Sequence, residues 1–189
     1  VSEKLRVNHG LSDECNTEFT LSEKCRTSDE PEVLLWGDSF AMHLMPGLLA
    51  SNPNLKIMQA TVISCGPVFN IASISSKLSK SFSKQCIETN DRVYDLLRKQ
   101  KSIKFVVMGS LFSSYVDEDA TILLRDGSVL PGAKVADHYV TETIRSIKEL
   151  GKIPVIFSPT PQNGFDIGRC LAKATQFGGS YGDCDFDQT

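Results

Sequence analysis

The segment EVLLWGDSF, residues 32–40, decides the fold class of this chain. Its apolar run Val33–Trp36 shows no polar alternation and stops at Gly37, as expected of a strand that is buried on both faces of a sheet. Apolar residues then recur near helical spacing up to Ala50, and Pro46 is expected to kink or delay that helix. The segment therefore predicts a strand, a tight turn and a helix.

The same order of elements recurs along the chain. Apolar runs predict further strands at 55–61, 104–108 and 154–157, and apolar stripes predict a helix over 86–99 and another that ends near Gly151. Residues 64–84 read as a long Ser-rich loop, and residues 120–131 read as an inserted hairpin with a type I′ turn at Asp126-Gly127. This alternation predicts an α/β fold with three layers around a doubly wound parallel sheet, in which sites form at the carboxyl ends of the strands.

Length and composition fit one globular domain. The chain has 189 residues, of which 41% are hydrophobic and 23% are charged. Its net charge is -3 and it has no basic run, so neither a nucleic acid nor an anionic membrane surface is supported as a partner. No apolar stretch approaches the roughly 20 residues that cross a bilayer. A neutral or small partner is expected.

The cysteines indicate disulfides. They number six, with no Cys-x-x-Cys pair and none beside a histidine, which makes a zinc site a poor interpretation. Pairing in chain order closes three short loops, each of which would stabilise the fold by roughly 2–4 kcal/mol. The expected pairs are Cys15–Cys25, Cys65–Cys86 and Cys170–Cys184. They favour an oxidising compartment, and six reduced core cysteines in a cytosolic protein remain the alternative.

Ser39 is the candidate nucleophile. It follows a buried strand and opens a helix, so the helix N-terminus places partial positive charge beside a developing oxyanion, and the serine amide can donate to that oxyanion. The alternative interpretation is that Asp38 or Ser39 serves only as the N-cap of the helix.

These motifs resemble the SGNH (GDSL-like) hydrolases. The segments that carry the resemblance are LLWGDSFAMHLMPGL (34–48), SCGPVF (64–69), CIETNDRVYDLL (86–97), VVMGSLFSSY (106–115), LGKIPVIFSPTPQN (150–163) and RCLA (169–172). More narrowly, they are similar to the periplasmic SGNH domains that follow acyltransferase-3 membrane domains in bacterial O-acetyltransferases. The resemblance implies a flavodoxin-like SGNH fold, Ser39 as nucleophile, and the amides of Ser39 and Gly66 as oxyanion donors.

The resemblance also implies a function and a setting. The expected reaction transfers an acetyl group from Ser39 to a hydroxyl of a surface glycan such as lipopolysaccharide O-antigen. Acetyl-CoA would supply acetyl groups at an upstream acyltransferase-3 domain, no cofactor is expected in this domain, and the protein would be periplasmic and tethered to the inner membrane. Residues 1–30 would be an extracytoplasmic linker packed on an SGNH domain of residues 31–189. The alternatives are a glycan O-acetylesterase of the same fold and a catalytically weak glycan-binding module.

The sequence departs from the family pattern in two places. Leu111 stands where the third family motif has an Asn that donates to the oxyanion. The family's Asp-x-x-His, which holds the general base, is not present in residues 1–189, so we expect a C-terminally incomplete domain that is nearly inactive alone.

The remaining candidates have simple interpretations. We expect His9 and His138 to be exposed and His43 to be partly buried and hydrogen-bonded. The acidic run Asp117–Asp119 is expected to be a solvated turn rather than a metal site. Core or pocket-wall positions are expected for Met42, Met45 and Phe69.

Overall fold

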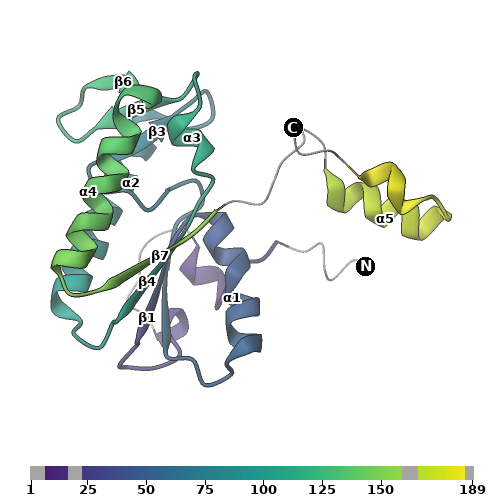
Figure 1. Ribbon diagram of the computed structural model, residues 1–189, viewed down its shortest axis with the longest axis horizontal. Coiled ribbons are helices and arrows are strands. Elements are labelled where there is room, and N and C mark those ends of the chain that lie inside the picture. Colours follow the sequence, from purple (N-terminus) through teal and green to yellow (C-terminus); the bar gives the residue numbers. More distant parts are fainter. Residues whose placement is uncertain (1–6, 17–22, 159–165, 186–189) are drawn as a thin grey trace. The chain divides into compact units, whose positions relative to one another are not determined.

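The first predicted strand is the centre of a parallel sheet. Strand β1 (Val33–Gly37) pairs with β2 (Ile57–Thr61) on one side and with β4 (Phe105–Gly109) on the other, and β4 pairs with β7 (Ile153–Phe157). The sheet order is β2-β1-β4-β7. Every residue of β1 and β2 is buried, which explains the absence of polar alternation in β1. The computed structural model, which describes residues 7–16, 23–158 and 166–185, thus has the predicted parallel sheet (Figure 1).

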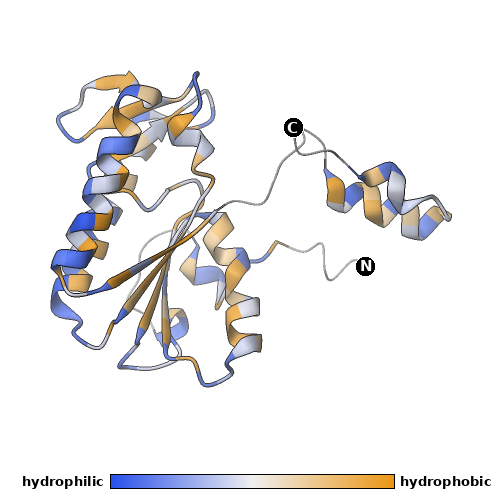
Figure 2. Ribbon diagram, in the orientation of Figure 1, coloured by the Kyte–Doolittle hydropathy of each residue, from blue (hydrophilic) through white to orange (hydrophobic). Residues whose placement is uncertain are grey.

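Helices cover both faces of this sheet. Helix α1 (Ser39–Ser51) packs Ala41 and Met45 on one face, whereas α2 (Lys80–Lys99) and α4 (Gly132–Glu149) pack on the other. The core between the sheet and the latter two helices contains Leu34, Trp36, Met58, Val93, Leu97, Val106, Met108 and Ile147. Figure 2 shows the strands largely in the hydrophobic colour and α4 with both colours. These are the three layers of the predicted doubly wound α/β fold.

Helix α1 differs from its prediction at the start. It begins directly at Ser39 and continues through Pro46, so the predicted delay is wrong. The reason is a strong cap: the Asp38 side chain accepts a hydrogen bond from the Phe40 amide and fixes the first turn.

The predicted loop at 64–84 contains a strand and a helix start. Strand β3 (Ile71–Ile74) pairs antiparallel with β5 (Thr121–Leu124), which pairs with β6 (Val129–Pro131) to form a second sheet. Helix α2 begins at Lys80 rather than at 86, because the Ser79 hydroxyl caps it by accepting from the Phe82 amide. The interpretation of 64–84 as a loop throughout is therefore wrong.

The inserted hairpin at 120–131 is present as β5 and β6, but its turn type is wrong. Only Gly127 of the turn has a positive φ, at +89°, whereas a type I′ turn needs positive φ at both central residues. The Gly127 amide donates to the Leu124 carbonyl oxygen (2.9 Å), and the Leu124 amide donates to Ser128 (2.9 Å). This is the pattern of a type I turn followed by a left-handed glycine. A short helix, α3 (Ser113–Val116), precedes the hairpin.

The described part of the N-terminal segment packs on β2. Two short 3₁₀ turns, η2 (Asp13–Cys15) and η3 (Glu23–Cys25), are joined by the Cys15–Cys25 disulfide. Arg26 bridges Met58, and the Thr27 amide donates to the Ile57 carbonyl oxygen (2.9 Å), so residues 26–27 lie along the outer edge of β2. That this segment is a linker of a larger protein stays a prediction.

Residues 8–159 and residues 160–189, the latter with 1–7, form separate contact units. In the second unit, α5 (Ile167–Phe177) begins at its cap Asp166 and is joined to η4 (Tyr181–Cys184) by the Cys170–Cys184 disulfide. The first unit holds Cys65–Cys86 as well as Cys15–Cys25, so the structure has the sequential pairing. None of the helices in the described ranges combines the length and the apolar character needed to cross a membrane.

Candidate functional site

Asp38 joins the loops that follow β1 and β4. One carboxylate oxygen, Oδ1, accepts from the Phe40 amide (2.8 Å). The other, Oδ2, accepts from the Ser110 hydroxyl (2.6 Å) and from the Leu111 amide (3.2 Å). The structure therefore gives the N-cap role to Asp38 rather than to Ser39, and the same side chain fixes the loop of the third family motif.

Burial has the largest effect on the pKa of this carboxyl group. Asp38 is only 5% exposed, and its burial raises its pKa above the ordinary value of 3.8. The hydrogen bonds from Ser110, Phe40 and Leu111 act in the opposite direction because they stabilise the charged form. Burial is the larger of these effects.

Ser39 lies at the N-terminus of α1 and is half-buried. None of the described residues forms a hydrogen bond with its hydroxyl, so that group is available to a substrate. Gly37 makes the approach of the two strand ends possible: a Cβ there would lie 1.9 Å from the Gly109 carbonyl oxygen, and its φ is +149°. The sequence therefore places an unbonded hydroxyl at a helix N-terminus, where the first-turn amides point outward.

Gly66, the predicted oxyanion donor, is buried on the loop after β2. Its amide donates to the Tyr115 hydroxyl at 3.2 Å. A Cβ at Gly66 would lie 2.7 Å from Tyr115 Cε2 and 2.9 Å from Ser110 Oγ, so this loop also meets the loop after β4. An oxyanion would have to compete with Tyr115 for the Gly66 amide, and the oxyanion role of Gly66 stays a prediction.

Tyr115 is neutral in this setting. It is 2% exposed, and its burial together with the nearby Asp38 charge raises its pKa. A neutral hydroxyl can accept from Gly66 and keeps its own proton to donate.

Asn90 is a positioning residue that the sequence interpretation missed. Its Nδ2 donates to the carbonyl oxygens of Gly66 (3.0 Å) and Val68 (2.9 Å), while its Oδ1 accepts from Trp36 Nε1 (3.0 Å). Asn90 therefore links the loop after β2 to the middle of β1. A signal for it exists in the sequence, since Asn90 interrupts the apolar stripe of α2 that includes Cys86, Val93 and Leu97.

The loop after β4 supplies no side-chain donor at its third position. Leu111 occupies that position, its amide is bonded to Asp38, and the Ser110 hydroxyl, which is fully buried, donates to the same carboxylate. The loop after β7 starts at Ser158, and the rest of it, residues 159–165, lies outside the described residues.

The histidines differ from expectation in two cases. His43 is exposed in α1 and no described residue bonds it, so the prediction of a buried, bonded side chain is wrong. His9 is half-buried and its Nδ1 lies 2.7 Å from Asp13 Oδ1, so the prediction of full exposure is wrong, because the chain around it packs on Gln59 of β2. His138 is exposed on α4, as predicted.

The other side chains that the sequence singled out have the expected positions. Met42, Met45 and Phe69 are buried in the core, and Asp117–Asp119 is exposed. Within the described ranges, no group of three or more His, Cys, Asp or Glu side chains is arranged to hold a metal ion.

Comparison with known families gives one match. The family model described as "SGNH domain (fused to AT3 domains)" covers residues 12–188, which is nearly the whole chain. Neither the curated proteins nor the solved structures gave a significant match. The matched range includes the Asp38-Ser39 turn, the Gly66 loop and the loop after β4 that the structure brings together. The chain therefore belongs to the family of SGNH domains that are fused to acyltransferase-3 domains.

Proposed function

We propose that this chain is the SGNH part of a bacterial O-acetyltransferase, in which Ser39 carries an acetyl group to a hydroxyl of a surface glycan such as lipopolysaccharide O-antigen. One observation carries the proposal. The Ser39 hydroxyl is half-buried at the start of α1, no described residue bonds it, and Asp38 has taken the capping role that would otherwise explain a serine there.

The proposed reaction has two steps. The general base takes the proton of Ser39, whose Oγ attacks the acetyl carbonyl carbon of the donor. The bond to the donor's leaving group breaks, that group departs with the proton, and an acetyl ester forms on Ser39. A glycan hydroxyl oxygen then attacks that ester, the bond to Oγ breaks, and Ser39 regains a proton while the acetyl group stays on the glycan. In both steps, the amides of Ser39 and Gly66 would donate to the oxyanion. The general base is proposed to be the histidine of an Asp-x-x-His segment outside this chain.

The proposed setting is the periplasmic side of the inner membrane. Fusion of this family to AT3 domains supports an acyltransferase-3 domain in the same polypeptide, which would pass on acetyl groups from acetyl-CoA. Three disulfides support an oxidising compartment.

Substitution of the nucleophile tests this function. In the full-length protein, Ser39→Ala should lower glycan O-acetylation by about three orders of magnitude or more, because no other described hydroxyl opens this helix. The melting temperature should not change, since Asp38 provides the cap. The measurement is the O-acetyl content of the glycan by NMR.

Ser81 is the matched control. It is an exposed serine in the first turn of α2, and Ser81→Ala should keep full O-acetylation. Unchanged O-acetylation in the Ser39→Ala protein would show that another group is the nucleophile.

Leu111 favours a second candidate, a glycan-binding module with little catalysis of its own. Its side chain cannot donate to an oxyanion, and loss of one such donor lowers rates by about 10²–10³ in other enzymes. An esterase of the same fold would use the same Ser39 ester and pass it to water. Analysis of the products with and without glycan distinguishes the three functions. Transfer gives acetylated glycan, hydrolysis gives free acetate, and a binding module gives neither product.

A further inference from the structure

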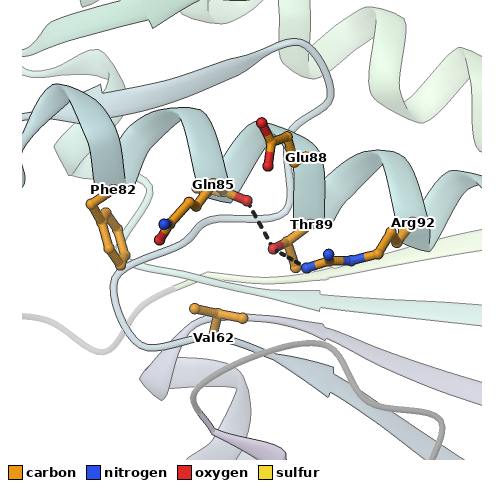
Figure 3. A pocket seen from close by; sticks show the side chains of 7 residues that line it. Val62, Phe82, Gln85, Glu88, Thr89 and Arg92 are labelled. Atoms are coloured by element: carbon orange, nitrogen blue, oxygen red, sulfur yellow. Dashed lines mark hydrogen bonds between the residues drawn. The ribbon is translucent and has the colours of Figure 1, made fainter.

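A cavity lies along α2. Its volume is about 320 Å³, within the range of small-molecule sites, which starts at roughly 300 Å³. Figure 3 shows Phe82, Gln85, Thr89 and Arg92 on the side of the helix toward Val62 of the loop after β2, whereas Glu88 projects from the helix away from Val62. The lining residues are Val62, Phe82, Gln85, Cys86, Glu88, Thr89 and Arg92.

Two connections link the walls of this cavity to the segments that carry Ser39 and Gly66. The Val62 amide donates to the Gly37 carbonyl oxygen (3.0 Å), two residues before Ser39. On the other wall, Cys86 is bonded to Cys65, which directly precedes Gly66. A ligand in the cavity would therefore contact residues that are bonded to the chain next to Ser39 and next to Gly66.

The polar groups of the cavity are available to a ligand. Glu88 and Arg92 are four residues apart on one helix, a spacing that permits an ion pair, yet they form none. Arg92 Nη2 donates to Thr89 Oγ1 (2.9 Å), which leaves the other N–H groups of the guanidinium unused by the described residues. The side chains of Gln85 and Glu88 have no hydrogen-bond partner within the described ranges.

The chemistry of these groups fits a sugar ring. The carboxylate accepts hydrogen bonds, the guanidinium donates them, and the amide does both. The neighbouring hydroxyls of a sugar can each donate and accept a hydrogen bond, so they match this set of groups. Phe82, half-buried, and Val62 offer apolar surface to the C–H face of a pyranose. Glu88 and Arg92 cancel in charge, which disfavours a phosphate or another strong anion.

We propose that the cavity between α2 and Val62 is the acceptor subsite that binds one pyranose unit of the glycan through Gln85, Glu88 and Arg92. The acceptor role rests on the proposed function, whereas sugar binding itself requires no turnover. The two can therefore fail separately.

A titration of the ¹⁵N-labelled chain by NMR tests the subsite. The probes are the methyl glycosides of mannose, rhamnose and N-acetylglucosamine, with inorganic phosphate as the competing class of ligand. At least one glycoside should shift the signals of the lining residues. Arg92→Met and Glu88→Gln should each weaken its binding about tenfold or more, since each removes charge-assisted hydrogen bonds. Both side chains are exposed on α2, so the variants should keep the native spectrum.

Lys84→Met is the matched control, because Lys84 is an exposed cation of the same helix outside the cavity. It should bind the glycoside as the unsubstituted chain does. The proposal is overturned if no glycoside shifts the lining residues, if phosphate alone binds there, or if Arg92→Met and Glu88→Gln bind like the control. Glycoside binding together with full O-acetylation by the Ser39→Ala protein would support the subsite and reject the proposed nucleophile.

Discussion

Asp38 shows how one side chain can organise a site without taking part in the chemistry. Its carboxylate accepts three hydrogen bonds, from Phe40, Ser110 and Leu111, and is nearly fully buried. A buried carboxylate with three donors is held in one position. Ser39, the next residue, is therefore placed by contacts that its own side chain does not make.

Asp38→Asn should destabilise the chain at neutral pH by about 1–3 kcal/mol, because the Leu111 amide would lose its acceptor. It should also remove a pH dependence. Burial raises the pKa of Asp38, so the folded chain binds a proton more tightly than the unfolded chain does. The stability due to this group is therefore full below the unfolded pKa of about 3.8 and is lost as pH rises through the folded pKa.

The measurement is the free energy of unfolding in urea at several values from about pH 3.5 to 7. Asp137→Asn, on an exposed position of α4, is the control and should leave the stability unchanged. An Asp38→Asn chain with the pH profile of the unsubstituted chain would contradict the proposed importance of this carboxyl group.

For single residues, the sequence predicts the position on a strand end or helix start but not the hydrogen-bond partner. The GDS segment correctly indicated a strand end followed by a helix, and left the N-cap open between Asp38 and Ser39. The contact between the Gly66 amide and Tyr115 joins positions 49 residues apart, so no local pattern could predict it. The hydrogen bond from Ser110 to Asp38 joins positions 72 residues apart and was likewise beyond any local pattern.

The loop after β2 is the element that depends most on its neighbours. It is held by the Cys65–Cys86 disulfide, by Asn90 of α2, and by Tyr115 of α3. These contacts come from two elements, α2 and α3. The loop therefore has one position relative to α2, the helix that also lines the cavity.

Replacement of both cysteines, Cys65→Ala with Cys86→Ala, should lower the free energy of unfolding by about 3 kcal/mol, because the bridge closes a loop of 21 residues. The measurement is urea unfolding followed by circular dichroism. The control is Cys170→Ala with Cys184→Ala, whose bridge lies in the other contact unit and should not affect this transition. Equal losses in the two variants would contradict the assignment of this bridge to the loop after β2.

The sequence predicts strongly patterned elements and misses those with distant partners. The four strands of the parallel sheet were predicted within two residues, because each is a short apolar run. Burial on both faces explains this pattern in β1 and β2, whereas β7 is partly exposed. Strand β3 is only four residues long, and its partner β5 lies far along the chain, so its pairing leaves no periodic signal nearby.

The whole chain should hydrolyse small activated acetyl esters slowly. Among the described residues, no histidine bonds Ser39, and a serine without a base is a weak nucleophile. Imidazole in solution should raise the rate of ester hydrolysis by the unsubstituted chain but not by the Ser39→Ala chain. The Ser39→Ala measurement also gives the rate at which imidazole itself reacts with the ester. Fast hydrolysis without imidazole that is lost in His43→Ala would instead identify His43 as the base.

The sheet is unpaired beyond β7 within the described residues, and β7 exposes apolar side chains. Ile153, Ile156 and Phe157 are 53%, 47% and 40% exposed. Such an edge favours pairing with another copy of the chain. Sedimentation should show concentration-dependent association that Ile156→Lys suppresses. Val129→Lys, an equally exposed apolar position on β6, is the control, and equal suppression by it would rule out β7 as the contact.

The two edges of this sheet differ in whether they can pair with another strand. Arg26 and Thr27 occupy the outer edge of β2, so among the described residues the β7 edge is the one left to accept a new strand. Two copies that join through β7 leave no open edge for a third, and the association ends at a pair. Removal of residues 1–30 would also expose the edge of β2. Each copy could then pair at both edges of its sheet, which allows growth into a fibre.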